Sequence, residues 1–277
     1  MNRLLRDPVA CLGLVLVLFA ALVAAFAPWL APYPDDAFDS HLLQRLKPPS
    51  AEFPFGTDYL GRDILSRVIL GTRNAIAVAV SVVLAAMVIG VPMGLVAGWR
   101  DNWLSDVLMR VTDVFLAVPQ LILALALGQL MAPGLFTAMV ALSLTYWPFF
   151  ARTVYAETRR LRGALFVDAL AGLGASPTRI LLLHVLPNAA PAILVRATIG
   201  MGFTILTAAI LGFLGVGAAP PSPDWGLAVA EARQHLPESW WFATFPGLAI
   251  LLLVLGFNLL GDGLRDVADP RLRRSRK

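Results

Sequence analysis

Charged residues are scarce in this chain. Asp, Glu, Lys and Arg make up 14% of its 277 residues, whereas an ordinary soluble domain carries about 25%. With 58% hydrophobic residues and a mean hydropathy of +0.74, the chain has too little polar surface to enclose a soluble core. Lipid removes this difficulty because apolar side chains can then face outward. The composition therefore predicts a membrane protein.

Cysteine and histidine are equally rare. Cys11 is the single cysteine, which excludes an intrachain disulfide and a cysteine-based metal cluster. The three histidines, His41, His184 and His235, are scattered along the chain. No Gly-x-x-x-x-Gly-Lys-Ser/Thr loop occurs, so we expect no ATP binding by this chain. The sequence predicts no catalytic residue, metal site or cofactor, which argues against a membrane-embedded enzyme.

Six apolar segments are long enough to cross a bilayer, which takes about 20 residues in a helix. The charged residues Arg110, Asp113, Arg196 and Asp262 lie toward segment ends. The sequence thus predicts an all-α, polytopic membrane protein with six transmembrane helices and both termini on one side. An ion-coupled transporter would need intramembrane charges or broken helices, which we do not expect here. The six segments are 9–30, 74–98, 107–131, 133–151, 191–217 and 242–261.

The first segment has an alternative interpretation as a cleaved signal peptide. It has a basic start, with Arg3 and Arg6, and an Ala25-Phe26-Ala27 stretch suited to cleavage. Pro28 disfavours cleavage after that stretch, and the apolar run is long for a signal peptide. We therefore expect a retained helix.

Basic residues set the expected orientation. The net charge of +4 could suggest nucleic acid binding, but the basic residues cluster at the edges of apolar segments. Most of them fall in 1–8, 99–106, 152–190 and 262–277, and cytoplasmic loops carry such an excess. The sequence predicts a multi-pass protein of a bacterial-type inner membrane, with both termini cytoplasmic and no nucleic acid partner.

Two long loops, 31–73 and 218–241, are then expected outside. Within the first, residues 60–70 have the apolar spacing of a short amphipathic helix at the interface. The Trp240-Trp241 pair at the end of the second loop is typical of the headgroup region, where the last span begins.

Charged residues in the first loop allow two interpretations. Asp58, Arg62, Asp63 and Arg67 are spaced so that several can pair on one helical face. They are either a self-paired surface or a docking surface for a binding protein. A separate acidic group could be a nickel port, but we favour a solvated loop. This group comprises Asp35, Asp36, Asp39 and His41.

The cytoplasmic segment 152–190 is predicted to form a helix–turn–helix. The first helix is expected at about 156–172 and the second at 177–186, ending near Pro187. Gly174 suits a left-handed turn, Ser176 a helix cap, and Pro177 the first helical position. Local chemistry thus predicts a rigid turn on this face.

This segment resembles the EAA signature of ABC importer permeases. Asp168-Ala169-Leu170, Gly174 and Leu186-Pro187 have the spacing of Glu-Ala-Ala, Gly and Leu-Pro in that signature. The chain departs from it at Asp168, Leu170 and His184, the last standing where the signature has Ile. In the family this loop is the coupling helix that docks on the ATPase subunit. The resemblance therefore implies ATPase coupling by Asp168, Ala169, Gly174, Ser176, Pro177, His184, Leu186 and Pro187.

Four further stretches resemble the dipeptide, oligopeptide and nickel branch of that family. The resemblance identifies the chain as a second, C-type permease. It implies a homologous permease partner, two ATPase subunits that hold ATP and magnesium, and an extracytoplasmic binding protein. We favour peptides as substrate, with nickel or another small solute as the alternative. The four stretches are 55–67, His184–Asn188, Phe213–Gly217 with Trp225-Gly226, and Phe257–Asp266 with Asp269-Pro270-Arg271.

The expected organisation has three parts. Residues 1–71 form an N-terminal helix and outer segment, 72–265 form the transmembrane domain with its coupling loop at about 156–188, and 266–277 form a basic tail. Glycines predict close helix packing within the second and fifth spans, and those of the second span have small-xxx-small spacing. They are Gly90, Gly94, Gly98, Gly212 and Gly215.

Overall fold

A computed structural model of the chain describes residues 7–35 and 37–268. Over these residues the chain is helical and contains no β-strand, as predicted. Arg3, Arg6, Asp36 and most of the basic tail lie outside the described residues. The α-helices are α1 (Pro8–Leu30), α2 (Ile64–Trp99), α3 (Trp103–Ala117), α4 (Gln120–Gly128), α5 (Leu135–Arg162), α6 (Leu165–Gly172), α7 (Pro177–Ile180), α8 (Leu186–Phe213), α9 (Trp225–Ala232) and α10 (Trp240–Ala268).

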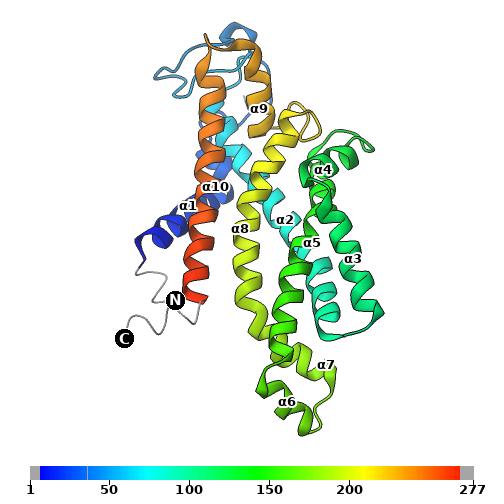
Figure 1. Ribbon diagram of the computed structural model, residues 1–277. Coiled ribbons are helices and arrows are strands. Elements are labelled where there is room, and N and C mark those ends of the chain that lie inside the picture. Colours follow the sequence, from blue (N-terminus) through cyan, green and yellow to red (C-terminus); the bar gives the residue numbers. More distant parts are fainter. Residues whose placement is uncertain (1–6, 36, 269–277) are drawn as a thin grey trace.

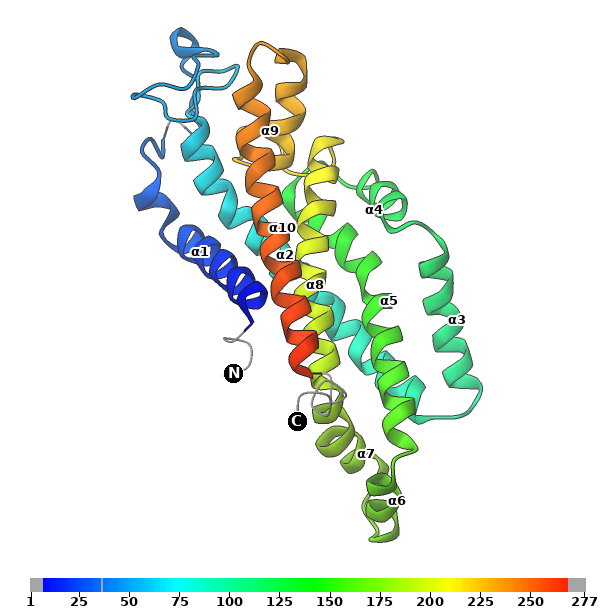
Figure 2. The ribbon, with the colours of Figure 1, turned by 60° about the vertical axis from the view of Figure 1, so that its left-hand side comes forward.

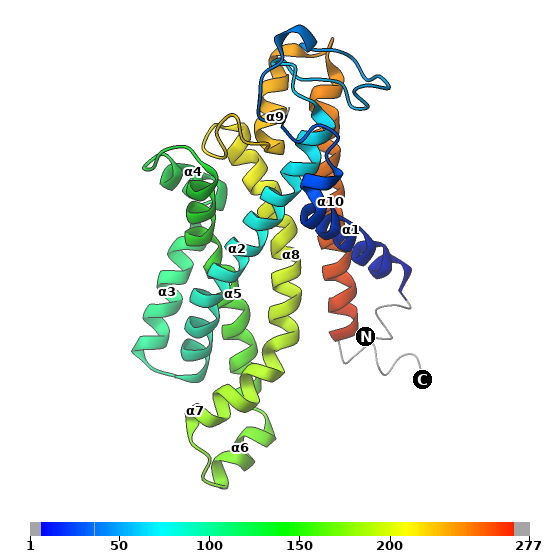
Figure 3. The ribbon, with the colours of Figure 1, turned by 180° about the vertical axis from the view of Figure 1, so that it is seen from behind.

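The long helices form an elongated bundle. Helix α8 packs against α10, α2 and α5, while α1 packs against α10 and α2 (Figure 1). From behind, α2 crosses the bundle from the side of α1 to the side of α5 (Figure 3). Helix α9 lies at one end of the bundle, and α6 and α7 project beyond the other helices at the opposite end (Figure 2). We call these the α9 end and the α6–α7 end.

Among the residues that the structure describes, four helices are long and apolar enough to cross a membrane, or five if one bent pair is a single span. The four are Pro8–Leu30, Ile64–Trp99, Pro177–Phe213 and Trp240–Val267. Helix α5, predicted as a span, falls outside this group because Ser, Thr and Tyr interrupt its apolar stretch. Several apolar spans are thus confirmed, but the predicted count of six is not reached by length and hydropathy.

The predicted third span, 107–131, is broken. Helices α3 and α4 meet at an angle of 86°, with Val118 and Pro119 between them. A proline clashes with a helical conformation of the residue before it, and Val118 is accordingly extended. The prediction of one continuous helix here is wrong.

The predicted amphipathic helix at residues 60–70 is not a separate element. Helix α2 begins at Ile64, where the Asp63 side chain caps it by accepting the backbone N–H of Ser66 at 2.7 Å. It then runs without a break to Trp99, because no helix-breaking sequence separates the amphipathic turns from the apolar span. The predicted interface helix and the predicted second span are therefore one helix of 36 residues.

Glycines bring α2 and α5 into close contact, as predicted. A Cβ atom on Gly90 would lie 2.4 Å from the carbonyl oxygen of Trp147, and one on Gly94 would lie 2.6 Å from that of Ala151. Gly212 similarly faces Asp224, but Gly215 has open space around it and a φ of +83°. Gly215 therefore serves a turn after α8 and not the predicted packing.

The second long loop holds an unpredicted helix. Helix α9 begins after Asp224, whose carboxylate accepts the backbone N–H of Leu227 at 2.9 Å. Helix α10 then begins at Trp240, as the tryptophan pair predicts. The fifth predicted span ends at Phe213 rather than at residue 217.

Candidate functional site

The predicted helix–turn–helix lies at the α6–α7 end. Helix α5 continues to Arg162 and stops at Gly163, and α6 begins two residues later at Leu165. The predicted first helix at 156–172 is therefore two helices, because the chain changes direction at Gly163. Asp168 and Ala169 lie exposed on α6.

The turn has the predicted chemistry. Gly174 has a φ of +79°, and the backbone N–H of Ala175 closes the end of α6 by donating to Leu170 at 3.0 Å. Ser176 caps α7 by accepting the N–H of Arg179, and Pro177 occupies the first helical position. Glycine adopts such a φ without the strain that residues with a large side chain incur, so this residue suits the turn.

The second helix does not end at Pro187. A π-helical turn, Leu181–Val185, joins α7 to α8, so that one helical span runs from Pro177 to Phe213. A proline lacks an N–H and its ring crowds the carbonyl four residues earlier, and a widened turn gives that ring room. The predicted helix end near Pro187 is wrong, because the π-helical turn accommodates the proline ring and the helix continues.

Around this turn the predicted coupling residues are mostly exposed. Gly174, Ser176 and Pro177 are exposed, as is Pro187, while His184 and Leu186 are half-buried. The backbone carbonyl of His184 accepts the side-chain N–H of Asn188 at 2.6 Å. The part of the chain that the structure describes holds no group of three or more potential metal ligands, so His184 belongs to no such group.

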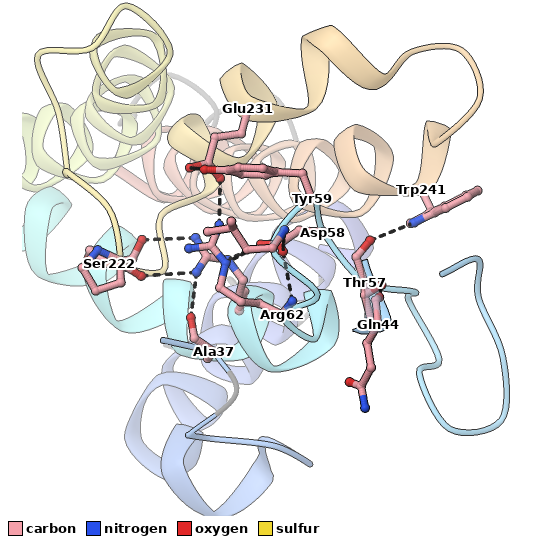
Figure 4. Close-up of polar contacts among 12 residues, drawn as sticks. Ala37, Gln44, Thr57, Asp58, Tyr59, Arg62, Ser222, Glu231 and Trp241 are labelled. Atoms are coloured by element: carbon pink, nitrogen blue, oxygen red, sulfur yellow. Dashed lines mark hydrogen bonds and ion pairs between the residues drawn. The ribbon is translucent and has the colours of Figure 1, made fainter. Parts of the chain in front are cut away.

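A buried charge cluster lies at the α9 end (Figure 4). We use this name for Asp58, Arg62, Arg67 and Glu231, whose side chains are at most 11% exposed. The Arg62 guanidinium pairs with Asp58 at 2.5 Å and with Glu231 at 3.1 Å. Asp58 also lies 3.7 Å from Arg67. Two positive and two negative side chains thus balance inside one buried network.

The cluster ties together segments that are distant in the sequence. Asp58 accepts the backbone N–H groups of Leu60 and Arg62, which shapes the loop before α2. Arg67 donates to the carbonyl of Ala37 at 2.7 Å and to those of Pro221 and Ser222. The first long loop, α2 and the second long loop are therefore joined by arginine hydrogen bonds.

This geometry favours the self-paired alternative for these residues over a docking surface. Asp58, Arg62 and Asp63 are fully buried and Arg67 is 3% exposed. Side chains without exposed area do not contact a partner directly, and Asp58 and Arg62 precede the helix instead of sharing a face with Arg67. Any contribution to docking by these residues therefore passes through the loops that they hold.

Residues that sequence analysis missed complete the cluster. Glu231 on α9 has no neighbouring sequence signal, and only the fold places it beside Arg62. Burial raises the pKa of its carboxyl above the ordinary value, and the Arg62 guanidinium opposes that rise.

Trp225 and Trp241, by contrast, stand out in the sequence as tryptophans. Their indole N–H groups donate to the carbonyls of Val68 at 3.0 Å and Thr57 at 3.2 Å.

Comparisons with known proteins agree with this architecture. Residues 90–274 match the family described as binding-protein-dependent transport system inner membrane component. Residues 1–49 match the N-terminal TM domain of oligopeptide transport permease C. Together these matches cover α1 and the bundle from the last part of α2 onward, and residues 50–89 lie in neither.

Curated relatives align over nearly the whole chain. The dipeptide transport system permease protein DppC of Alkalihalophilus pseudofirmus is 39% identical over 98% of this chain and 89% of its own. The glutathione transport system permease protein GsiD of Pectobacterium atrosepticum is 40% identical over 98% and 90%.

Among solved structures, the inward-facing MetNI methionine ABC transporter shares the fold. The TM-score is 0.58 at 21% identity, over 73% of this chain and 96% of the other. With the apolar spans described above, these matches establish a multi-pass membrane protein: the chain belongs to the family of binding-protein-dependent transport system inner membrane components.

Proposed function

We propose that this chain is one of two membrane-spanning subunits of an ATP-driven peptide importer. The observation that carries the proposal is the capped turn at the α6–α7 end, which projects as a rigid, exposed element beyond the long helices (Figure 2). A projecting element of fixed shape can transmit the motion of a separate ATPase to the spans. Family membership supports the same role.

The proposed coupling surface is the exposed part of the α6–α7 end. Leu165 and Leu173 are 87% and 84% exposed there, near Asp168. Large exposed leucines beside a rigid turn suit burial in a groove of a partner protein. ATP and magnesium would bind in the two ATPase subunits, and this chain would transmit their closure through Gly174 and Pro177 to α8.

The proposed orientation places the α6–α7 end in the cytoplasm and the α9 end outside. Arg159, Arg160 and Arg162 occupy the last turn of α5 next to that end, as expected for a cytoplasmic boundary. In this orientation the loops held by the buried charge cluster face the binding protein.

Peptides are the proposed substrate. Relatives at about 40% identity include proteins named for dipeptide and glutathione transport. A nickel path would be helped by clustered ligands, and the described residues hold no group of three or more. The permease partner and the binding protein complete the proposed assembly.

Reconstitution tests this function. The chain is assembled in proteoliposomes with the permease, ATPase and binding-protein subunits proposed as its partners, and uptake of a labelled dipeptide is measured. We expect uptake of the dipeptide to require both ATP and the binding protein. Excess nickel should not inhibit this uptake by competition. Uptake that persists without ATP and collapses with a proton ionophore would instead establish ion coupling.

A further inference from the structure

Arg196 is a cation inside the bundle. The sequence places it near the start of an apolar segment, but α8, the helix that holds it, begins earlier, at Leu186. In the structure Arg196 lies ten residues after the start of α8 and 17 residues before its end at Phe213. A charge so far from both ends of a span is costly, and such residues commonly serve substrate pathways.

Aromatic rings from α5 hold this arginine. Its guanidinium carbon lies 4.6 Å from the centre of the Phe149 ring and 5.7 Å from that of Tyr146. The Tyr146 ring is itself fixed, because it packs on Gly200, where a Cβ atom would lie 2.6 Å from the tyrosine oxygen. The cation is therefore preorganised between α5 and α8.

Arg196 has donors that the chain does not use. Its Nε is buried without a hydrogen-bond partner, and no ion pair to Arg196 forms within residues 7–35 and 37–268. Arg152, also facing a neighbouring helix, contrasts with it by pairing with Asp113. Ring faces stabilise the positive charge but accept few of its N–H groups, so the guanidinium retains capacity for an anion.

A carboxylate is the group that best completes this site. A guanidinium binds a carboxylate through two parallel N–H bonds, and it stays charged at every physiological pH. The side chain is half-buried, which leaves it accessible to a small group. Every peptide with a free C-terminus carries a carboxylate. A peptide can therefore supply the anion that the apolar spans around Arg196 do not.

Aromatic contacts also occur at arginines of this chain that have ion-pair partners, such as Arg62 over Tyr59. Arg196 differs because Phe149 and Tyr146 contact it while no carboxylate of the described residues pairs with it. We propose that Arg196, held by Tyr146 and Phe149, binds the C-terminal carboxylate of peptides as they pass; this inference rests on the proposed function.

The test compares a dipeptide with its C-terminal amide in the reconstituted importer, each at saturating binding protein. We expect Arg196→Met to lower uptake of the dipeptide about tenfold, the effect of losing one hydrogen-bonded charge. Uptake of the amide should change less than about twofold, which is the scatter expected of a surface substitution. Arg110→Met, which removes an exposed arginine from α3, is the matched control and should leave both uptakes unchanged. Arg196→Lys should retain part of the preference for the dipeptide over its amide.

A second measurement needs no binding protein. Thermal unfolding of the purified complex should shift upward with free dipeptide at millimolar concentration, but not with the amide, and Arg196→Met should abolish the shift. The inference would be overturned if Arg196→Met lost uptake of the dipeptide and the amide equally, or if the two compounds shifted thermal unfolding equally. Either result would mean that Arg196 forms a structural pair with the partner permease. Wild-type complexes that import neither compound would overturn the proposed function as well.

Discussion

Arg62 and Glu231, 169 residues apart in the sequence, form an ion pair of 3.1 Å between the loop before α2 and helix α9. The same guanidinium binds Asp58, so one buried cation serves two carboxylates from two parts of the chain (Figure 4). The α9 end is therefore assembled by charge pairing as well as by apolar packing.

Removing Arg62 should destabilise the α9 end. Arg62→Met leaves the buried carboxylates of Asp58 and Glu231 without their main partner, and breaking a buried pair in this way costs about 3–5 kcal/mol. We expect a lower thermal midpoint of the purified complex and faster proteolysis of residues 37–63. Arg159→Met, which breaks an exposed pair with Asp101, is the control and should change neither measurement appreciably. Equal stability of the two variants would contradict a structural role for the cluster.

Gly174 should be required for coupling because of its backbone conformation alone. No atom lies within 4 Å of a Cβ built at Gly174, so Gly174→Val creates strain at positive φ, about 1–2 kcal/mol, without a clash. Transport and binding-protein-stimulated ATP hydrolysis should fall, while basal hydrolysis persists. Gly174→Asn should retain most coupling, because asparagine tolerates this conformation.

Gly163 offers the matched control for that experiment. It lies in the same projecting segment and has a φ of −83°, and a Cβ there would meet only the carbonyl oxygen of Arg160, at an unstrained 4.0 Å. Gly163→Val should therefore leave stimulated hydrolysis close to the wild-type rate. Normal uptake by Gly174→Val at normal expression would exclude the turn as the mechanical link.

The contact between α2 and α5 should not tolerate a methyl group at Gly94. A Cβ there lies 2.6 Å from a backbone oxygen of α5, which side-chain rotation does not relieve. Gly94→Ala should lower stability by about 1–3 kcal/mol, measured by thermal unfolding in detergent. Gly247→Ala in α10, where a Cβ meets nothing within 4 Å, should be neutral or slightly stabilising. Matching thermal midpoints for the two variants would show that the helices are not in tight contact.

The proposed orientation predicts which end is accessible from outside. In a Cys11→Ser background, Leu43→Cys should react with a membrane-impermeant thiol reagent in intact cells, because Leu43 is fully exposed at the α9 end. Thr178→Cys, exposed at the α6–α7 end, should react only after the cells are opened. The reverse pattern would invert the topology.

The sequence by itself determined the features that depend on local chemistry. Low charge and long apolar runs determined a helical membrane protein, and the EAA-like spacing led to the family. Gly174, Ser176 and Pro177 specified the projecting turn, because a positive φ, a cap and a first-turn proline each act within a few residues. The glycine spacing in α2 indicated close helix packing there, but only the structure shows that α5 is the partner.

Only the tertiary structure decided how distant segments meet. Asp58, Arg62 and Arg67 looked like a surface because sequence spacing does not report burial, and the packing of α9 encloses them. Arg196 looked like a segment-end residue, but α8 begins at Leu186, ten residues before it. Its aromatic partners come from α5, about 50 residues earlier in the chain, and Glu231 meets Arg62 across 169 residues. Such pairings depend on the free energy of packing the whole bundle, which no local pattern encodes.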